Sequence, residues 1–147
     1  MENFLKIVSS GRPNAVAVVK GSNGLLGKVR FFETREWVAV EASFVGLPEN
    51  KFLGFHIHEK GECDSNFSSA GGHYGTGEHP FHAGDMPPLF STKNGVAFSV
   101  FLTSRFSISE ILGKAVIVHN MADDFTSQPA GSSGERIGCG VIFRTYF

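Results

Sequence analysis

The chain has 147 residues, of which 41% are hydrophobic, so it is long enough for one domain with a substantial core and too short for two domains of ordinary size. Its formal net charge of −1, with no run of lysine and arginine, provides no general attraction to nucleic acid or to an anionic membrane surface. Since no apolar stretch is long enough to cross a bilayer, we expect a single domain over residues 1–147 that binds neither nucleic acid nor membrane.

The N-terminal segment 1–13 contains a short apolar stretch that Ser9, Ser10 and Gly11 interrupt. It therefore lacks the hydrophobic region of a secretory signal peptide. On this basis the protein is expected to be cytoplasmic, or to be exported with a leader that is absent from this sequence.

Most of the chain consists of short runs rich in valine, isoleucine and phenylalanine, which predict β-strands. The predicted strands are residues 15–20, 26–33, 37–44, 52–58, 96–102, 114–119 and 137–143. Glycine and proline separate these runs, and residues 21–24 are expected to form a hairpin loop. Residues 106–112 are expected to form one helical turn capped by Ser107 or Ser109. These elements predict an all-β, turn-rich sandwich.

Two stretches, residues 59–88 and 120–135, have no strand pattern and hold most of the polar residues. Long irregular loops inside a compact domain are usually functional. We therefore expect both loops to contribute to the functional site.

All six histidines fall in one pattern along the chain. His56 and His58 occupy alternate positions of a predicted strand, so both side chains point to one face and can converge on a metal ion. Alone, such a pair is more often a polar strand face, and a lone loop histidine such as His73 normally faces solvent. The glycines before His73, however, allow a close approach of the backbone to a metal centre.

A denser group follows, in which His79 and His82 precede Asp85. These residues form a mixed nitrogen and oxygen set that suits tetrahedral zinc. His119 adds another imidazole at the end of a predicted strand. Six imidazoles and one carboxylate exceed the ligand set of one mononuclear site, which indicates two metals that share a ligand.

Cys63 and Cys139 are the only cysteines of the chain. In a cytosolic protein two buried thiols are the more common arrangement. Because Cys63 lies in the loop after the His-x-His pair and Cys139 in a predicted strand, a bridge between them would tie that loop to the sheet. Both arrangements remain open from the residues alone.

The motifs together resemble the copper–zinc superoxide dismutase family, in the family's order and over roughly residues 15–143. They are Gly54–His58, Ser69–His73, His82–Asp85, Gly113–His119 and Gly134–Ile142. The resemblance implies an eight-stranded Greek-key β-sandwich or barrel with two long functional loops. It also implies a bacterial-like member of the family, because Cys63 follows His58 closely and both loops are short.

The resemblance further implies the ligands of both metals. Copper, one per chain, would be bound by His56, His58, His73 and His119. Zinc, one per chain, would be bound by His73, His79, His82 and Asp85. His73 would then be a bridging imidazolate between the two cations.

Four further residues take their expected roles from the family. Asp123 would link a copper histidine to a zinc histidine from outside the ligand set, Arg136 would position the anion beside copper, and Cys63 and Cys139 would form the intrasubunit disulfide. Arg136 and His73 are thus the expected catalytic residues. The family resemblance also makes a homodimer one assembly to expect.

Two departures from the family pattern affect these expectations. The intervals between His73, His79 and His82 are short, so zinc binding requires a tight turn, which the segment around Gly75 and Gly77 can provide. The alternative is a copper-only protein in which His79 and His82 face solvent. The loop 120–135 has no lysine, so steering of the anion would depend on Arg136 and on lysines elsewhere.

The function implied by the resemblance is superoxide dismutation. Copper would alternate between Cu(II) and Cu(I) and convert two superoxide anions and two protons to dioxygen and hydrogen peroxide. The alternative is a non-catalytic copper- and zinc-binding module for metal storage or delivery. Arg136 favours the enzyme, because metal storage does not require an anion guide.

Overall fold

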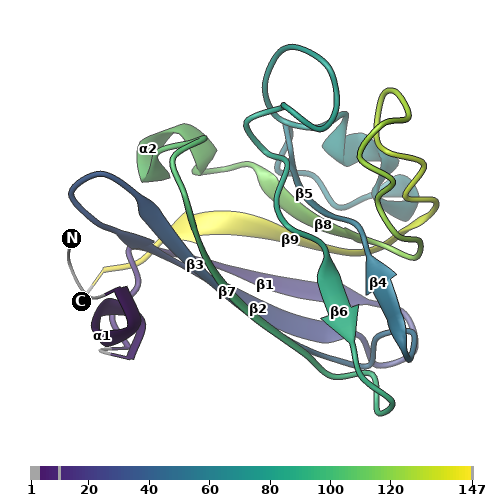
Figure 1. Ribbon diagram of the computed structural model, residues 1–147, viewed down its shortest axis with the longest axis horizontal. Helices are drawn as coiled ribbons and strands as arrows, with labels where there is room; N and C mark the ends of the chain where they lie inside the picture. Colours follow the sequence, from purple (N-terminus) through teal and green to yellow (C-terminus); the bar gives the residue numbers. More distant parts are fainter. Residues whose placement is uncertain (1–3, 10, 147) are drawn as a thin grey trace.

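The computed structural model describes residues 4–9 and 11–146. Its regular structure is almost entirely β, as predicted (Figure 1). The strands are β1 (Ala15–Gly21), β2 (Leu26–Glu33), β3 (Val38–Val45), β4 (Lys51–Leu53), β5 (Phe55–His58), β6 (Leu89–Ser91), β7 (Ala97–Thr103), β8 (Ala115–His119) and β9 (Arg136–Arg144). Three short helices accompany them, namely α1 (Phe4–Ser9), η1 (Ser65–Ala70) and α2 (Ile108–Ile111).

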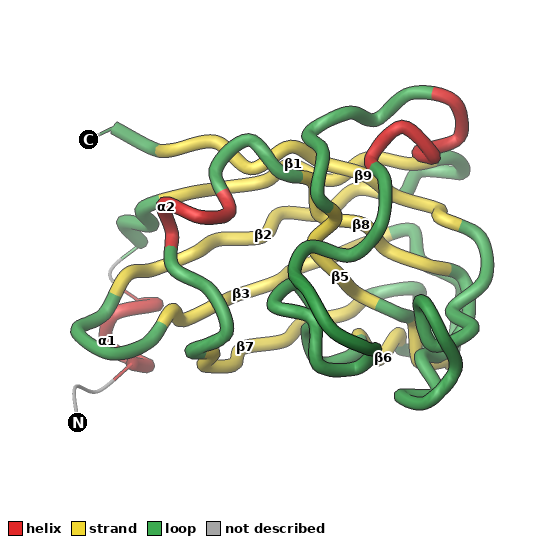
Figure 2. The backbone as a smooth tube through the Cα atoms, turned by 90° about the horizontal axis from the view of Figure 1, so that it is seen from above, coloured by secondary structure: helices red, strands yellow, loops and turns green. Residues whose placement is uncertain are grey.

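Seven of the strands form one antiparallel sheet in the order β5-β8-β9-β1-β2-β3-β7, and β4 pairs with β6 in a second sheet. The large sheet is curled, and β4 and β6 lie on its open side, between the ends formed by β5 and β7 (Figure 1). The two long loops gather at the end of the sandwich where β5, β8 and η1 lie (Figure 2). The predicted all-β sandwich is therefore confirmed.

The core lies inside the curled sheet and is built from the alternate residues of each strand that face inward. Two edge-to-face ring pairs connect its layers: Phe31 with Phe106 at 6.2 Å between centroids, and Phe44 with Phe55 at 5.9 Å. The four rings are buried. Such pairs stabilise a core by about 0.5–1.5 kcal/mol beyond the burial of their area.

Four local differences from the predicted elements arise. The predicted strand 52–58 is divided at Gly54 into β4 and β5, and if these two are counted together the expected eight strands are present. Strand β6 and the helices α1 and η1 have no counterpart among the predicted elements, whereas α2 forms with Ser107 as its N-cap, as predicted. None of the described helices is long and apolar enough to cross a membrane.

Candidate metal centre

The centre is built on the adjacent antiparallel strands β5 and β8. His56 and His58 are both fully buried on β5, and the N–H of His119, at the end of β8, donates to the carbonyl of Gly54 over 2.8 Å. The break between β4 and β5 at Gly54 thus allows His119 to lie beside the His-x-His pair. The prediction that the side chains of His56 and His58 point to one face is confirmed, since their rings lie 6.3 Å apart.

The loop 59–88 returns to the other edge of β5. Isolated β-bridges pair His58 with His73 and His56 with Asp85. The Ile57 N–H donates to the Gly84 carbonyl, and the Ile57 carbonyl accepts from the Tyr74 N–H, both over 2.8 Å. The loop therefore satisfies the edge of β5 and, by the same contacts, brings its own metal-binding side chains to the histidine pair.

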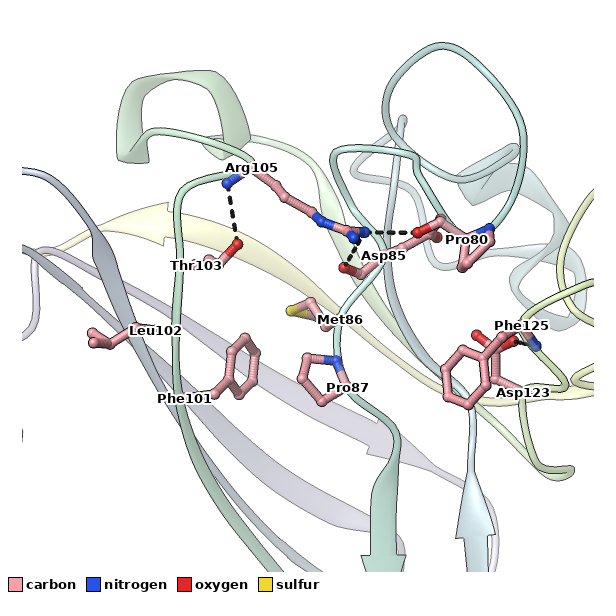
Figure 3. Close-up of a pocket in the computed structure, with 10 residues that line it drawn as sticks. All are labelled: Pro80, Asp85, Met86, Pro87, Phe101, Leu102, Thr103, Arg105, Asp123 and Phe125. Carbon is pink, nitrogen blue, oxygen red and sulfur yellow. Dashed lines mark hydrogen bonds between the residues drawn. The ribbon is translucent and has the colours of Figure 1, made fainter.

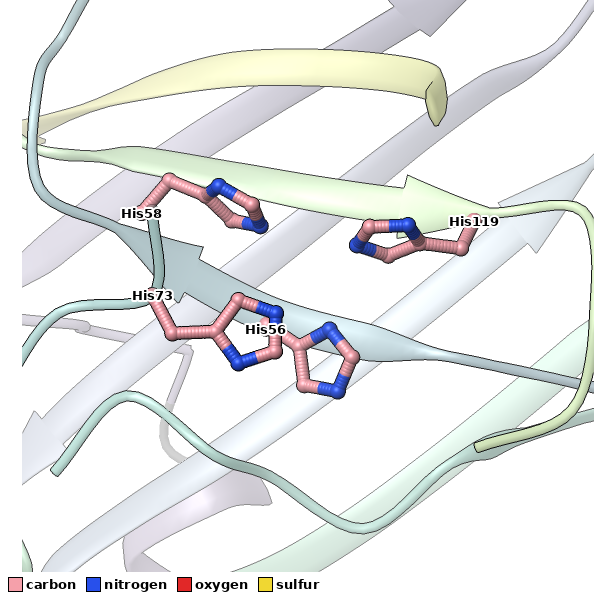
Figure 4. A group of neighbouring side chains, drawn as sticks. All are labelled: His56, His58, His73 and His119. Atoms are coloured by element: carbon pink, nitrogen blue, oxygen red, sulfur yellow. The ribbon is translucent and has the colours of Figure 1, made fainter. Parts of the chain in front are cut away.

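Four imidazoles form the first cluster, on and beside β5 and β8 (Figure 4). One ring nitrogen from each of them lies within 4.8 Å of the others; the residues are His56, His58, His73 and His119. In each of these four rings one nitrogen has no hydrogen-bond partner, namely His56 Nδ1, His58 Nε2, His73 Nε2 and His119 Nε2. Buried polar atoms are normally paired, so four unpaired nitrogens that converge indicate a metal-binding position.

The opposite ring nitrogens of three of these histidines all have partners. His56 Nε2 lies 2.8 Å from Asp123 Oδ2, His58 Nδ1 lies 2.8 Å from the Gly71 carbonyl oxygen, and His119 Nδ1 lies 3.3 Å from that of Gly134. An acceptor at the outer nitrogen holds the proton there and leaves the inner nitrogen as a lone-pair donor. The rings are therefore fixed in the tautomer that a metal ion requires.

Burial also keeps these imidazoles neutral. It lowers the pKa of His58 to about 2 and that of His119 to about 3. Burial likewise lowers the pKa of His56, although its contact with Asp123 opposes the shift. Since a metal competes with protons for imidazole nitrogen, ligands that are already neutral at neutral pH release no proton on binding.

A second cluster surrounds the carboxylate of Asp85. His73 Nδ1 lies 2.7 Å from Asp85 Oδ1, while His79 Nδ1 and His82 Nδ1 lie 3.2 Å and 3.1 Å from Asp85 Oδ2. Tetrahedral zinc with ligands at about 2.0–2.2 Å requires ligand atoms roughly 3.4 Å apart, and the two contacts of Asp85 Oδ2 approach that separation. The group whose ligand atoms all lie within 4.8 Å of one another is His56, His73, His79 and Asp85, so His82 joins the cluster through its contact with Asp85. The outer nitrogen of His82, Nε2, lies 2.9 Å from the Gly77 carbonyl oxygen.

The shortened loop thus brings His79 and His82 to Asp85, and neither histidine faces solvent. Gly75 makes the turn possible: its φ is +112°, and a Cβ there would lie 2.5 Å from the backbone nitrogen of Ala83. His73 belongs to both clusters, with Nε2 toward the first and Nδ1 toward the second.

Asp123 connects the two clusters from loop 120–135. Its Oδ2 lies 2.8 Å from His56 Nε2, and its Oδ1 lies 2.7 Å from His79 Nε2. Burial raises the pKa of Asp123, but its hydrogen bonds with His56, His79 and the Phe125 N–H outweigh burial and hold the pKa below its ordinary value. Asp123 is therefore an anion in contact with one histidine of each cluster.

Gly131 packs directly against this carboxylate. Its φ is +69°, and a Cβ would collide with Asp123 Oδ1 and lie 2.6 Å from His79 Nε2. Loop 120–135 can therefore approach the histidines this closely only because position 131 has no side chain.

Arg136, the first residue of β9, pairs with His119 across the β8–β9 ladder. Its guanidinium is half-buried and donates to the Phe67 carbonyl in η1 over 2.8 Å. Burial lowers the pKa of Arg136, but a guanidinium remains cationic at any physiological pH. Arg136 therefore provides a fixed positive charge at the edge of the first cluster.

The disulfide expected from the resemblance is present. Cys63 and Cys139 are bonded, with their Cα atoms 5.7 Å apart, and join the segment before η1 to β9. The bridge closes a loop over a sequence separation of 76 residues. A cross-link of that span limits the unfolded chain and is typically worth about 2–4 kcal/mol.

Several groups that hold the centre were not identified from the sequence. The carbonyls of Gly71, Gly77 and Gly134 orient histidines, and Gly54 and Gly131 permit close approaches. A backbone carbonyl has no residue signature. The one signal of these close approaches in the sequence was the glycines near His73 and those around residues 131–134.

Comparison with known proteins agrees with this geometry. A family model described as copper/zinc superoxide dismutase matches residues 25–142. The chain is 38% identical over 136 residues to superoxide dismutase [Cu-Zn] 2 of Aquifex aeolicus, covering 80% of this chain and 79% of that protein. It is 36% identical over 126 residues to superoxide dismutase [Cu-Zn] of Legionella pneumophila, covering 80% and 77%.

Solved structures with the same architecture include a double mutant of a SOD-like protein from Bacillus subtilis. That structure has a TM-score of 0.81 and 34% identity, and the match covers 87% of this chain and 96% of the other. The clock protein EA4 has a TM-score of 0.82 and 28% identity, with 90% and 96% covered. From the family match, the similarity to named dismutases and the two histidine clusters, the chain belongs to the copper/zinc superoxide dismutase family and is an enzyme of that type, with copper and zinc as cofactors.

Proposed function

We propose that the protein dismutates superoxide at copper held by His56, His58, His73 and His119, beside zinc held by His73, His79, His82 and Asp85. The observation that carries this proposal is the set of unpaired, converging ring nitrogens, whose opposite nitrogens are all anchored. Copper supplies the one-electron chemistry, Cu(II) to Cu(I) and back, by which two superoxide anions and two protons become dioxygen and hydrogen peroxide.

The roles of the protein's own groups follow from their positions. His73 can hold a proton at Nε2, which has no protein partner, while Nδ1 stays at the Asp85 carboxylate. Arg136 attracts and orients the small anion with a charge that pH does not remove. Asp123 keeps His56 and His79 from rotating. The substrate in this proposal is a small anion at the edge of the first cluster, so the reaction does not need a large substrate pocket.

The test of the proposal combines elemental analysis with a superoxide dismutation assay on one preparation. We expect one copper and one zinc per chain, and a dismutation rate that disappears when copper is removed by a chelator and returns when copper is restored. A protein that binds both metals fully but does not dismutate superoxide would contradict the proposal.

A second candidate is a non-catalytic module that stores or delivers copper and zinc. It is worth testing because the clock protein EA4, whose name is not that of a dismutase, has the same architecture. Arg136 distinguishes the two candidates, because only an enzyme that acts on an anion needs a positive charge to guide its substrate. The two-metal preparation without dismutation described above would favour this module.

Replacing Arg136 with alanine should keep copper bound and lower the dismutation rate about tenfold at low ionic strength, because the guanidinium attracts superoxide but binds no metal. The salt dependence of the rate should weaken as well, since salt screens steering and leaves ligation unaffected. Arg136→Lys should retain part of both effects. Arg144→Ala, the same loss of charge at the exposed far end of β9, is the control. An unchanged rate in Arg136→Ala would show that Arg136 does not guide the anion.

A further inference from the structure

The segment 79–85 carries Asp85 and two of the three histidines that contact its carboxylate, but it has no helix or strand of its own. Its internal backbone bonds are two short turns, from the Phe81 N–H to the Glu78 carbonyl and from the Asp85 N–H to the His82 carbonyl. Such a segment has few contacts that hold its ligands at zinc-binding separations. Within the segment the His82 N–H donates to Asp85 Oδ2 over 3.0 Å, and the further contacts come from other parts of the chain.

Gln128, in loop 120–135, holds the backbone of His79 through both of its polar groups. Its side-chain Oε1 accepts from the His79 N–H over 2.9 Å, and its Nε2 donates to the His79 carbonyl over 2.8 Å. The same Nε2 lies 3.2 Å from the Thr126 carbonyl oxygen. Because Asp123 holds the ring of His79, this residue is fixed at its backbone by one side chain and at its imidazole by another.

Arg105 holds the same segment from another part of the chain, the bend that follows β7. Its Nη1 donates to the Pro80 carbonyl over 2.7 Å and lies 3.5 Å from the carbonyl oxygen of Asp85 (Figure 3). Arg105 is itself held by a bond from its N–H to Thr103 Oγ1 over 3.1 Å. One guanidinium group thus contacts the start and the end of the segment, beside a cavity of about 270 Å³.

We propose that Gln128 and Arg105 are positioning residues that preorganise segment 79–85 for zinc, and so slow the loss of the metal. The inference rests on the zinc site of the proposed function. Neither side chain offers an atom to the metal. Their effect is to order the ligands before zinc binds, so that binding does not also have to order the backbone that carries them.

The experiment measures the rate at which zinc passes from the fully loaded protein to a chromophoric chelator. We expect release about tenfold faster in Gln128→Met and about tenfold faster in Arg105→Met, because each variant removes hydrogen bonds to the ligand backbone but keeps a side chain of similar length. The double variant should be faster than either single variant. Arg105→Lys keeps one cationic nitrogen, so its rate of zinc release should be closer to that of the original protein. Arg35→Met, the same change as Arg105→Met at a nearby exposed arginine, should leave the release rate unchanged.

A second measurement separates positioning from general stability. With Co(II) in place of zinc, the visible d–d absorption of the Gln128→Met and Arg105→Met variants should broaden or shift, because the ligand geometry is less uniform. The melting temperature of the zinc-free protein should change little, while the increase that zinc produces should become smaller. Equal losses of melting temperature with and without zinc would overturn the inference.

The outcomes also separate this inference from the proposed function. If the original protein takes up no zinc, the zinc assignment itself fails. If the original protein retains zinc and both methionine variants release it at the original rate, the zinc site stands and the positioning role of Gln128 and Arg105 is wrong.

Discussion

Replacing His119 with alanine is expected to lower the dismutation rate by more than about a hundredfold. Loss of an outer partner of a metal-bound histidine commonly costs 10–100-fold in metal affinity or activity, and loss of the ligand itself should cost more. His119 Nε2 is one of the four unpaired nitrogens of the first cluster, and no further His, Cys, Asp or Glu of the described residues belongs to this group.

The measurement is a dismutation assay together with the Cu(II) electron paramagnetic resonance spectrum, both after loading with copper. The spectrum of His119→Ala should change because one nitrogen has left the copper. The matched control is His82→Ala, which removes an imidazole only from the Asp85 cluster and should keep the copper spectrum close to the original. Original-like activity in copper-loaded His119→Ala would show that His119 is not a copper ligand.

Replacing Asp85 with alanine is expected to abolish zinc binding and to leave copper binding intact. Three imidazole nitrogens lie within 3.2 Å of the Asp85 carboxylate, so its loss removes the centre of the second cluster. A ligand at about a thousand times its dissociation constant stabilises the folded state by about 4 kcal/mol. For a chain of this size, a loss of that order should lower the melting temperature by about 10 °C.

Differential scanning calorimetry of the original and Asp85→Ala proteins, each with and without zinc, measures this effect. Glu78→Ala is the matched control, since it removes an exposed carboxylate next to the same turn. The two-metal interpretation would be wrong if the original protein, offered both metals, bound one copper and no zinc. His73 would then serve copper alone.

The strands and the convergence of the histidines were predictable because both depend on local periodicity. Alternate residues of a strand share a face, which is sufficient to place His56 beside His58. The ends of β8 and β9 likewise follow the apolar runs that the sequence shows. The tight turn through Gly75 that brings His79 toward His73 was also predictable from its glycines. The disulfide needed the family resemblance, because the residues alone left two free thiols open.

The remaining features depend on contacts between distant segments. Helix α1 has only a short apolar run, and Val8 becomes buried because Phe32 and Ala39 offer it an apolar patch on the outer face of the sheet. Pairing of loop 59–88 with the edge of β5 uses backbone groups, which every residue has. The side chain of Gln128 likewise contacts His79, 49 positions away, only at its backbone, so no residue pattern marks the pair. Such contacts could not be predicted from the sequence, because they form only in the folded structure. The homodimer stays a prediction from the resemblance.

Gly131 has a consequence for how the chain tolerates mutation. Loop 120–135 is largely exposed and contains serine, proline and glycine, which is the composition of a segment that normally accepts substitutions and insertions. At position 131 even alanine would push a methyl group into the carboxylate that joins the two clusters. In a complete substitution scan position 131 should therefore be as intolerant as any in the core, although its neighbours Ala130 and Ser132 are partly or fully exposed.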